Sequence, residues 1–237
     1  MKISICIPMY NESSIIEETA KTLSEYMSEN FEDYEIIFSD DGSVDGSSDL
    51  VRQLSLPCVR VVGYEKNQGK GRAVKEAVLA AEGDIIMFTD ADLAYGTEVI
   101  GRFAEKMEDQ AETDVLVGSR NISKDGYEGY TFVRKLASKV YIKLLCFAGG
   151  LKLSDSQCGC KAFRGDAAKR IFSYCEVNGF AFDFEVIMLA TRMKMKMGEI
   201  AVKVINHRES KVHVFSDAFR MMKDLRGMKK RIKRLKI

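Results

Sequence analysis

The chain has 237 residues, of which 46% are hydrophobic, and its formal net charge is +1. It contains only two prolines and no Pro/Gly/Ser-rich linker, so we expect one large domain with a sizeable core. No stretch approaches roughly eighteen consecutive apolar residues, which excludes a membrane-spanning helix, and the N-terminus lacks the pattern of a signal peptide. We therefore expect a cytoplasmic protein with reduced cysteines.

The charge is distributed unevenly. Nine of the residues from 220 to 237 are lysine or arginine and one is aspartate, so the rest of the chain is acidic on balance. Apolar residues recur in this segment at helical spacing, at Met221, Met222, Leu225, Met228, Ile232 and Leu235. This pattern predicts a basic amphipathic helix over residues 220–237 that lies on an anionic membrane surface, with a helix packed on the domain or a disordered tail as alternatives. Without interleaved aromatic residues, the tail predicts no nucleic-acid partner.

Strand-like and helix-like patterns alternate through the first half. Short apolar runs predict strands, and apolar residues at three- and four-residue spacing predict helices. The expected strands are Ile3–Ile7, Glu35–Phe38, Val59–Tyr64, Ile85–Thr89 and Val115–Gly118. The expected helices are Ser13–Met27, Asp45–Leu54, Gly71–Ala81 and Val99–Met107. This alternation predicts an α/β fold with a Rossmann-like, mostly parallel sheet and helices on both faces.

The second half is less regular. Residues 121–130 contain two glycines and little periodicity, which predicts a mobile loop with a substrate-gating role. The remaining expected elements are the helices Phe132–Phe147, Ala167–Phe172 and Phe184–Lys194 and the strand Ile200–Ile205.

Two aspartates, Asp90 and Asp92, directly follow the buried strand pattern that starts at Ile85. Ligands of open α/β sheets bind outside the carboxyl ends of the strands. Two carboxylates at such a place repel each other, and their usual partner is Mg²⁺ or Mn²⁺ carrying a diphosphate. The alternative is a solvated turn at the end of a strand, and the neighbouring motifs favour the metal site.

Three other expected strands also end in polar clusters, which are residues 8–12, 40–43 and 67–71. In a parallel sheet these ends converge on one edge, where they describe a site for a large polar ligand. The residue types suit a nucleotide: Tyr10 to stack on a base, Glu12 to bind a ribose hydroxyl, Asp40 or Asp41 to accept a hydrogen bond from the base, Lys70 as a cation, and Gly69 and Gly71 for close backbone approach. Neither a Walker loop nor the dinucleotide-binding fingerprint is present.

Together these clusters resemble the motifs of glycosyltransferase family 2, whose members have the GT-A fold. The resemblance rests on Pro8-x-Tyr10-Asn11-Glu12, Asp40-Asp41-Gly42-Ser43-x-Asp45-Gly46, Asn67-x-Gly69-Lys70-Gly71-x-Ala73 and Asp90-Ala91-Asp92-Leu93. Later motifs resemble those of the polyprenyl-phosphate hexosyltransferases in this family: Gly118-Ser119-Arg120, Asp155-Ser156-Gln157-Cys158-Gly159-x-Lys161-Ala162-Phe163, Phe182-Asp183-x-Glu185 and Glu209-Ser210-Lys211.

The resemblance implies a metal-dependent, inverting transfer of a hexose from a nucleotide-diphospho sugar to dolichyl or undecaprenyl phosphate. The Asn-x-Gly-Lys-Gly and Phe-Asp-x-Glu motifs are more similar to the glucosyl type, which favours UDP-glucose as the donor. In the mannosyl type an arginine stands six residues before the lysine that corresponds to Lys211, and here that position is Ile205, which disfavours GDP-mannose. The enzyme is expected to act at the inner face of a membrane.

The resemblance also implies roles for individual residues. The donor would be bound by Pro8, Tyr10, Glu12, Asp40, Asp41, Lys70, Asp90, Ala91 and Asp92, with Mg²⁺ or Mn²⁺ held by Asp90 and Asp92. The acceptor phosphate would contact Arg120, Arg134, Ser138 and Lys211, and the catalytic residues would be Asp92, Arg120 and Arg134. Residues 1–118 would form the nucleotide-sugar half and residues 119–219 the acceptor half.

An alternative is a family 2 enzyme that uses a saccharide or another hydroxyl acceptor. Such an acceptor needs a carboxylate as general base, and Asp155 or Asp183 are the candidates. Asp183 and Glu185 have two interpretations: they line the acceptor side, as the resemblance implies, or they cap or salt-bridge the start of a helix.

Overall fold

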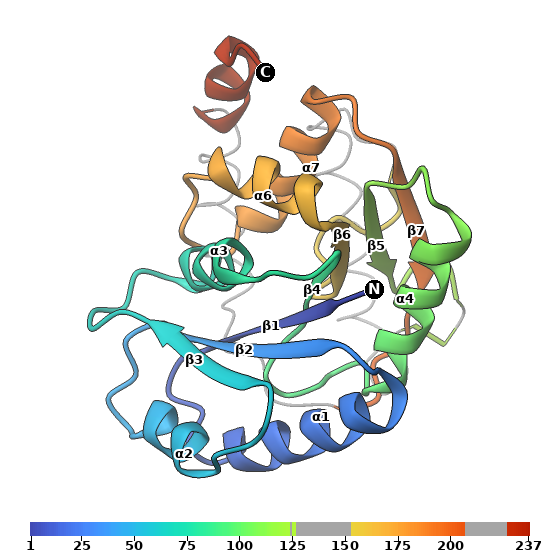
Figure 1. The fold of residues 1–237 in the computed structure, drawn as a ribbon. Coiled ribbons are helices and arrows are strands. Elements are labelled where there is room, and N and C mark those ends of the chain that lie inside the picture. The colour runs from blue at the N-terminus through green and yellow to red at the C-terminus, as the bar shows by residue number, and fades with distance from the viewer. Residues whose placement is uncertain (124, 127–152, 207–226) are drawn as a thin grey trace.

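The computed structural model describes residues 1–123, 125–126, 153–206 and 227–237. Its strands form a single seven-stranded sheet in the order β3-β2-β1-β4-β6-β5-β7 (Figure 1). The strands are β1 Ile3–Met9, β2 Tyr34–Asp40, β3 Val59–Gly63, β4 Ile85–Phe88, β5 Val115–Ser119, β6 Lys161–Arg164 and β7 Met197–Ala201. The helices are α1 Ile16–Asn30, α2 Ser47–Gln53, α3 Lys70–Ala80, α4 Glu98–Asp109, α6 Gly165–Ser173 and α7 Phe182–Arg192.

Six of these strands run parallel, and β6 runs antiparallel between β4 and β5. The carboxyl ends of β1, β2, β4 and β5 therefore meet at one edge of the sheet. This arrangement confirms the predicted α/β fold with a mostly parallel sheet.

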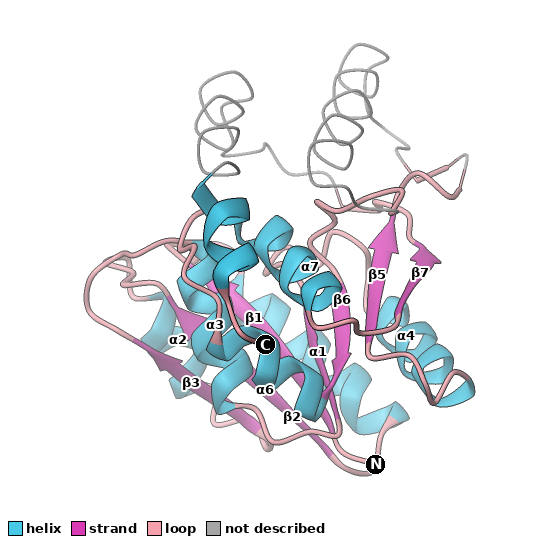
Figure 2. Ribbon diagram, turned by 90° about the horizontal axis from the view of Figure 1, so that it is seen from above, coloured by secondary structure: helices cyan, strands magenta, loops and turns pink. Residues whose placement is uncertain are grey.

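Helices cover both faces of the sheet, as predicted (Figures 1 and 2). On one face, α1, α2 and α4 pack through residues such as Leu23, Val51 and Phe103. On the other face, α3, α6 and α7 form a second core with residues such as Val74 and Phe172. Successive side chains of a strand point to opposite faces, so a strand between two helical layers is apolar throughout, which explains the continuous apolar runs of the sequence.

The sequence did not predict β6. This strand is only four residues long and lies between a polar segment and a helix, so it carries no periodic pattern. Tertiary packing stabilises it: Phe163 stacks on Phe88 of β4, with ring centroids 6.0 Å apart, and meets Phe172 of α6 edge-on at 5.6 Å.

The last strand was predicted too late in the chain. β7 ends at Ala201, because its partner β5 ends at Ser119 and no further residues are available for pairing. Beyond it the chain crosses to the segment that follows β4, where the amide of Ile205 donates to the carbonyl of Ala94 at 2.8 Å. The predicted helix Phe132–Phe147 and half of the predicted loop 121–130 lie outside the described residues.

The described part of the basic tail is helical over residues 227–234. Met228 and Ile232, which belong to the predicted membrane-facing stripe, are 4% and 3% exposed and belong to the core that contains α7. The expectation that this stripe lies in a membrane is therefore wrong for these two residues, because the domain itself covers them. Residues 220–226 lie outside the described part. None of the described helices is both long and apolar enough to cross a bilayer.

Candidate active site

The loops after β1 and β2 interlock at the carboxyl edge of the sheet. The amide of Asn11 donates to Ser43 Oγ at 2.9 Å, the amide of Val44 donates to Asn11 Oδ1 at 3.0 Å, and the amide of Glu12 donates to Ser47 Oγ at 2.9 Å. These hydrogen bonds hold the loop after β1 against the loop after β2. Pro8 is buried at the end of β1, whereas Tyr10 is 40% exposed, as expected for a side chain that stacks on a ligand.

Asp40 and Asp41 were predicted to bind a nucleobase, and the structure shows both engaged with the chain itself. Asp41 is 3% exposed and accepts hydrogen bonds from the Tyr64 hydroxyl at 2.7 Å and from the amides of Gln68 and Gly69 at 2.8 and 2.9 Å. This carboxylate shapes the loop between β3 and α3. Asp40 accepts from the Ser43 amide at 2.9 Å and from the Ser48 hydroxyl, and it is the more exposed of the two.

Lys70, the first residue of α3, reaches the carboxyl end of β4 and forms an ion pair with Asp90. Burial lowers the pKa of Lys70, but Asp90, Asp183 and Asp92 raise it by more, so the net pKa lies above the ordinary value. Three residues predicted for one site, Lys70, Asp90 and Asp92, are thus brought together from two separate segments, the start of α3 and the loop after β4.

Asp92 lies beside Asp90 in a partly buried position and accepts from the Ala94 amide at 3.1 Å. Burial and the charge of Asp90 raise the pKa of Asp92. Gly159, just before β6, lies so close to Asp90 that a Cβ on this glycine would clash with the Asp90 carboxylate. Two repelling carboxylates at a strand end suit a divalent cation, which would relieve their repulsion.

Within the described ranges no group of three or more acidic, cysteine or histidine side chains forms a closed metal cage. This donor set fits a hard cation such as Mg²⁺, which commonly takes one or two carboxylates and completes its shell with water and substrate phosphates.

Gly69 and Gly71 were predicted to let the backbone approach a ligand closely. In the structure, the backbone of residues 177–178 makes this close approach to Gly71. The amide of Gly71 donates to the carbonyl of Asn178 at 2.7 Å, and a Cβ on Gly71 would lie 2.5 Å from the carbonyl oxygen of Val177. The first turn of α3 is therefore fixed by the segment that precedes α7, and the Lys70 side chain at its start points to Asp90.

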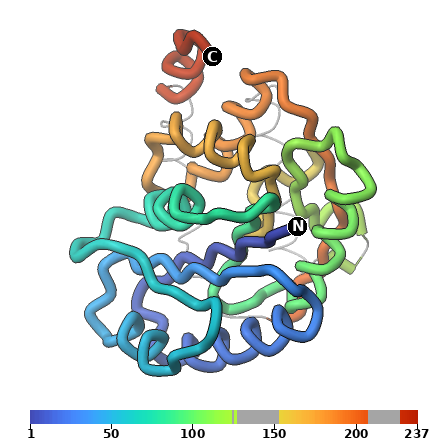
Figure 3. The backbone as a smooth tube through the Cα atoms, viewed as in Figure 1, coloured from blue at the N-terminus to red at the C-terminus, as the bar shows by residue number. Residues whose placement is uncertain are grey.

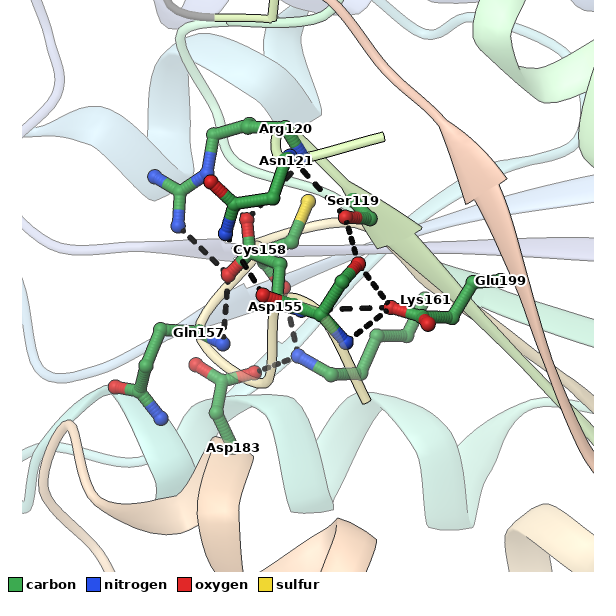
Figure 4. Close-up of polar contacts among 10 residues, drawn as sticks. Ser119, Arg120, Asn121, Asp155, Gln157, Cys158, Lys161, Asp183 and Glu199 are labelled. Atoms are coloured by element: carbon green, nitrogen blue, oxygen red, sulfur yellow. Dashed lines mark hydrogen bonds and ion pairs between the residues drawn. The ribbon is translucent and has the colours of Figure 1, made fainter. Parts of the chain in front are cut away.

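A second polar cluster surrounds the end of β5 (Figure 4). Arg120 donates to both oxygens of Asp155, at 2.7 Å from Nε and 3.0 Å from a terminal nitrogen. Asp155 is fully buried and also accepts from the Gln157 amide at 3.1 Å. Burial lowers the pKa of Arg120, but Tyr95 and Asp155 raise it well above the ordinary value, so the guanidinium stays charged.

The same cluster contains a buried lysine. Lys161, at the start of β6, is fully buried and donates to Asp183 at 2.5 Å and to the carbonyl of Cys158 at 2.6 Å. Burial raises the pKa of Asp183 against the opposing charges of Lys161 and Lys70. Glu185 accepts from the amides of Glu176 and Val177 at 3.0 and 2.9 Å. Both carboxylates form salt bridges, Asp183 with Lys161 and Glu185 with Arg231, and neither caps the start of α7, which has no side-chain cap.

Sequence reasoning assigned no role to Lys161, Tyr95 or Glu199. Lys161 was part of a motif that carried the resemblance, but a lysine is rarely fully buried and its partner lies far along the chain. Tyr95 is 9% exposed, and burial raises the pKa of its hydroxyl well above the ordinary value. Glu199 on β7 accepts from the Ser154 amide at 2.9 Å, and no sequence spacing indicates this contact. Arg134, Ser138 and Lys211 lie outside the described residues.

The fold and this edge of polar loops match one class of protein. Residues 4–172 match the sequence family described as glycosyl transferase family 2. The chain belongs to this family, which confirms the predicted resemblance, and the protein is a glycosyltransferase with the GT-A fold.

The curated relatives have a more specific name than the family. The chain is 30% identical over 239 residues to the dolichyl-phosphate beta-glucosyltransferase of Dictyostelium discoideum, with 94% of this chain and 72% of the relative covered. It is 29% identical over 238 residues to the dolichyl-phosphate beta-glucosyltransferase of Homo sapiens, with 94% and 74% covered.

Solved structures share the fold at lower identity. Glucosyl-3-phosphoglycerate synthase from Mycobacterium tuberculosis, in complex with Mn²⁺, UDP and glucosyl-3-phosphoglycerate, superposes with a TM-score of 0.70 at 17% identity, covering 98% of this chain and 79% of that one. Mannosyl-3-phosphoglycerate synthase from Rubrobacter xylanophilus gives 0.71 at 15% identity, covering 100% and 76%.

Proposed function

We propose that this glycosyltransferase moves a hexose from a nucleotide-diphospho sugar, with UDP-glucose preferred, to a polyprenyl phosphate such as dolichyl phosphate. The observation that carries the proposal is the convergence of Lys70, Asp90 and Asp92 at the carboxyl edge of the sheet. The curated relatives, which are named dolichyl-phosphate beta-glucosyltransferases, support the acceptor and the sugar. Residues 1–118 are assigned to the donor and residues 119–219 to the acceptor.

In the donor half, Tyr10 would stack on the base and Glu12 would bind the ribose. The diphosphate would lie beside Asp90 and Asp92, where Lys70 provides a fixed positive charge. A divalent cation bound by these aspartates, Mg²⁺ or Mn²⁺, would supply Lewis-acid stabilisation of the leaving nucleoside diphosphate. Lys70 exchanges its present contact with Asp90 for the phosphate oxygens as the donor enters.

In the acceptor half, a lipid phosphate is already anionic at neutral pH and needs no general base. The two candidate bases of the hydroxyl-acceptor alternative, Asp155 and Asp183, are both held in ion pairs, with Arg120 and Lys161. This arrangement supports a phosphate nucleophile over a hydroxyl. Arg120 would orient the acceptor together with Arg134, Ser138 and Lys211, and attack on the face opposite the leaving group would give a β linkage.

We further propose that the protein is held peripherally at the inner face of a membrane. The apolar side of the described tail is covered by the domain, so the attraction would come from its exposed basic residues, Lys229, Lys230, Lys233, Arg234 and Lys236. Each cation near an anionic leaflet contributes about 1 kcal/mol.

A direct transfer assay tests the proposal. The full chain is incubated with dolichyl or undecaprenyl phosphate and with UDP-glucose or GDP-mannose, in Mg²⁺, in Mn²⁺ and in a chelator. We expect a lipid-linked glucose from UDP-glucose that disappears with the chelator, and an anomeric proton coupling that reports the β linkage. Transfer to free saccharides but to no lipid phosphate would reject the acceptor, and a clear preference for GDP-mannose would reject the donor.

A further inference from the structure

The short segment from Cys175 to Gly179 connects the C-terminal helix to the candidate donor site. On one side it abuts the start of α3: the carbonyl of Asn178 accepts from the Gly71 amide at 2.7 Å. Lys75 of α3 donates from Nζ to the carbonyl of Cys175 at 2.7 Å. The segment therefore packs against the turn that aims Lys70 at Asp90.

On its other side the segment is held by a single buried carboxylate. Glu185, in the first turn of α7, is fully buried and accepts from the amides of Glu176 and Val177 at 3.0 and 2.9 Å. A buried carboxylate needs a compensating charge, because desolvation of the anion costs several kcal/mol.

That charge comes from the C-terminal helix. Arg231 contacts Glu185 through one terminal nitrogen and Glu176 through the other, at 2.5 Å for the second pair. Met228 and Ile232 anchor the same helix in the core of α7, and the Arg192 guanidinium donates to the carbonyl of Leu235 at 3.1 Å. Figure 3 shows this helix at the outer end of the layer that contains α6 and α7, away from the sheet.

We propose that Arg231 and Glu185 are positioning residues for the donor site. They hold the segment 175–179 against the first turn of α3 and so place Lys70 beside Asp90 and Asp92. The inference rests on the proposed function, because it assigns to Lys70 the diphosphate of a nucleotide sugar. It gives the C-terminal helix a role in donor affinity that is separate from membrane attraction.

The test measures the affinity of the full chain for UDP with Mn²⁺ by calorimetry, without lipid. Arg231→Met keeps the long apolar stem but removes the charge, and we expect UDP affinity to fall about 3- to 30-fold, the range of coupling seen for residues that act through others. Arg231→Lys should restore part of the affinity, because it can reach one of the two carboxylates. The matched control is Arg170→Met, which makes the same change at an exposed position on α6 and should leave affinity unchanged.

A double-mutant cycle that combines Arg231→Met with Lys70→Met distinguishes a positioning role of Arg231 from general destabilisation of the protein. If Arg231 acts through Lys70, Arg231→Met should weaken UDP binding much less in the Lys70→Met background than in the wild type. Equal losses in both backgrounds, or wild-type affinity in Arg231→Met, would overturn the inference. Thermal unfolding is followed for every variant, and if Arg231→Met does not fold, Glu185→Gln takes its place in the same cycle with the same two outcomes. A wild-type chain that binds neither UDP nor GDP would instead reject the proposed function.

Discussion

At the scale of single residues, the paired carboxylates and the buried ion pairs respond differently to substitution. Asp90 and Asp92 are partly buried and repel each other, so their position makes them suited to a cation. Arg120 and Asp155 neutralise each other inside the protein, so removing either one leaves an unpaired buried charge that destabilises the fold. The sequence predicted the first pair from its place after an apolar run. It could not predict the second, because the partners are far apart in the chain and only the fold brings them together.

We expect Asp92→Asn to abolish transfer while the protein remains folded. The amide keeps the shape of the side chain but removes one of the two negative charges that would hold the metal and the diphosphate. Transfer is measured with Mg²⁺ and with Mn²⁺, and UDP binding is measured with and without metal. Near wild-type turnover with either ion would show that Asp92 is not part of the metal site.

Arg120→Ala is expected to reduce stability as well as acceptor use. Removing this guanidinium leaves the fully buried carboxylate of Asp155 without its charge partner, which costs about 3–5 kcal/mol of unfolding free energy. Denaturant unfolding should show the loss, and adding Asp155→Asn should recover part of it. Arg52→Ala, in the exposed pair with Asp49, is the control and should cost less than about 1 kcal/mol. Equal losses at the two sites would contradict this account.

At the scale of elements, strands and helices with continuous or periodic apolar patterns were predicted to within a few residues, from β1 through β5 and from α1 through α4. The errors have a common cause. β6 is short and is stabilised by aromatic contacts with β4 and α6, and the end of β7 is set by the length of β5. Both features depend on contacts with neighbouring strands and helices, and a local sequence pattern carries no information about those contacts. The acidic loops were placed at the correct edge, but the internal roles of Asp41 and Gly71 depend on contacts between distant segments.

One interaction between elements makes a pH-dependent contribution to stability. Glu35 of β2 accepts from the Ser4 hydroxyl at 2.7 Å and from the Glu82 amide at 2.6 Å, and it pairs with Arg60 of β3 at 2.9 Å. Burial raises the pKa of Glu35, but these partners lower it by more, so its folded pKa lies below the ordinary value. The stabilisation is complete above the unfolded pKa of about 4.3 and is lost as the pH falls through the folded pKa.

Glu35→Gln should therefore lower the free energy of unfolding by about 1–3 kcal/mol at pH 7. The difference from the wild type should shrink as the pH falls below about 4, because the wild-type carboxyl is then protonated as well. Urea unfolding at a series of pH values measures it, with Glu25→Gln on the exposed side of α1 as the control. A constant difference across the series would rule out the carboxylate charge as its cause.

At the scale of the whole molecule, the C-terminal helix is part of the domain rather than an appendage. Of the predicted helix over residues 220–237, the described part is helical at residues 227–234. An apolar stripe has the same pattern whether lipid or protein covers it, so periodicity alone could not decide the partner.

This difference changes how the tail should be tested. Deleting residues 227–237 should lower the melting temperature, because the deletion removes the buried side chains of Met228 and Ile232 and exposes the part of the core that they cover. Replacing Lys230, Lys233 and Arg234 with glutamine should leave the melting temperature nearly unchanged and reduce sedimentation with anionic vesicles, more at low salt than at high salt. Vesicle binding that survives the triple substitution would place the membrane contact elsewhere.

The antiparallel strand β6 also has a consequence for the order in which the chain assembles. It pairs with β4 on one side and with β5 on the other, and these two strands do not pair with each other. During synthesis, the strands β1 to β4 can join as soon as they emerge, but β5 has no neighbour in the described sheet until residues 161–164 have been made, and it gains its second neighbour only with residues 197–201. The sheet is thus closed by a late segment, and loss of that segment leaves two unpaired strand edges that invite aggregation.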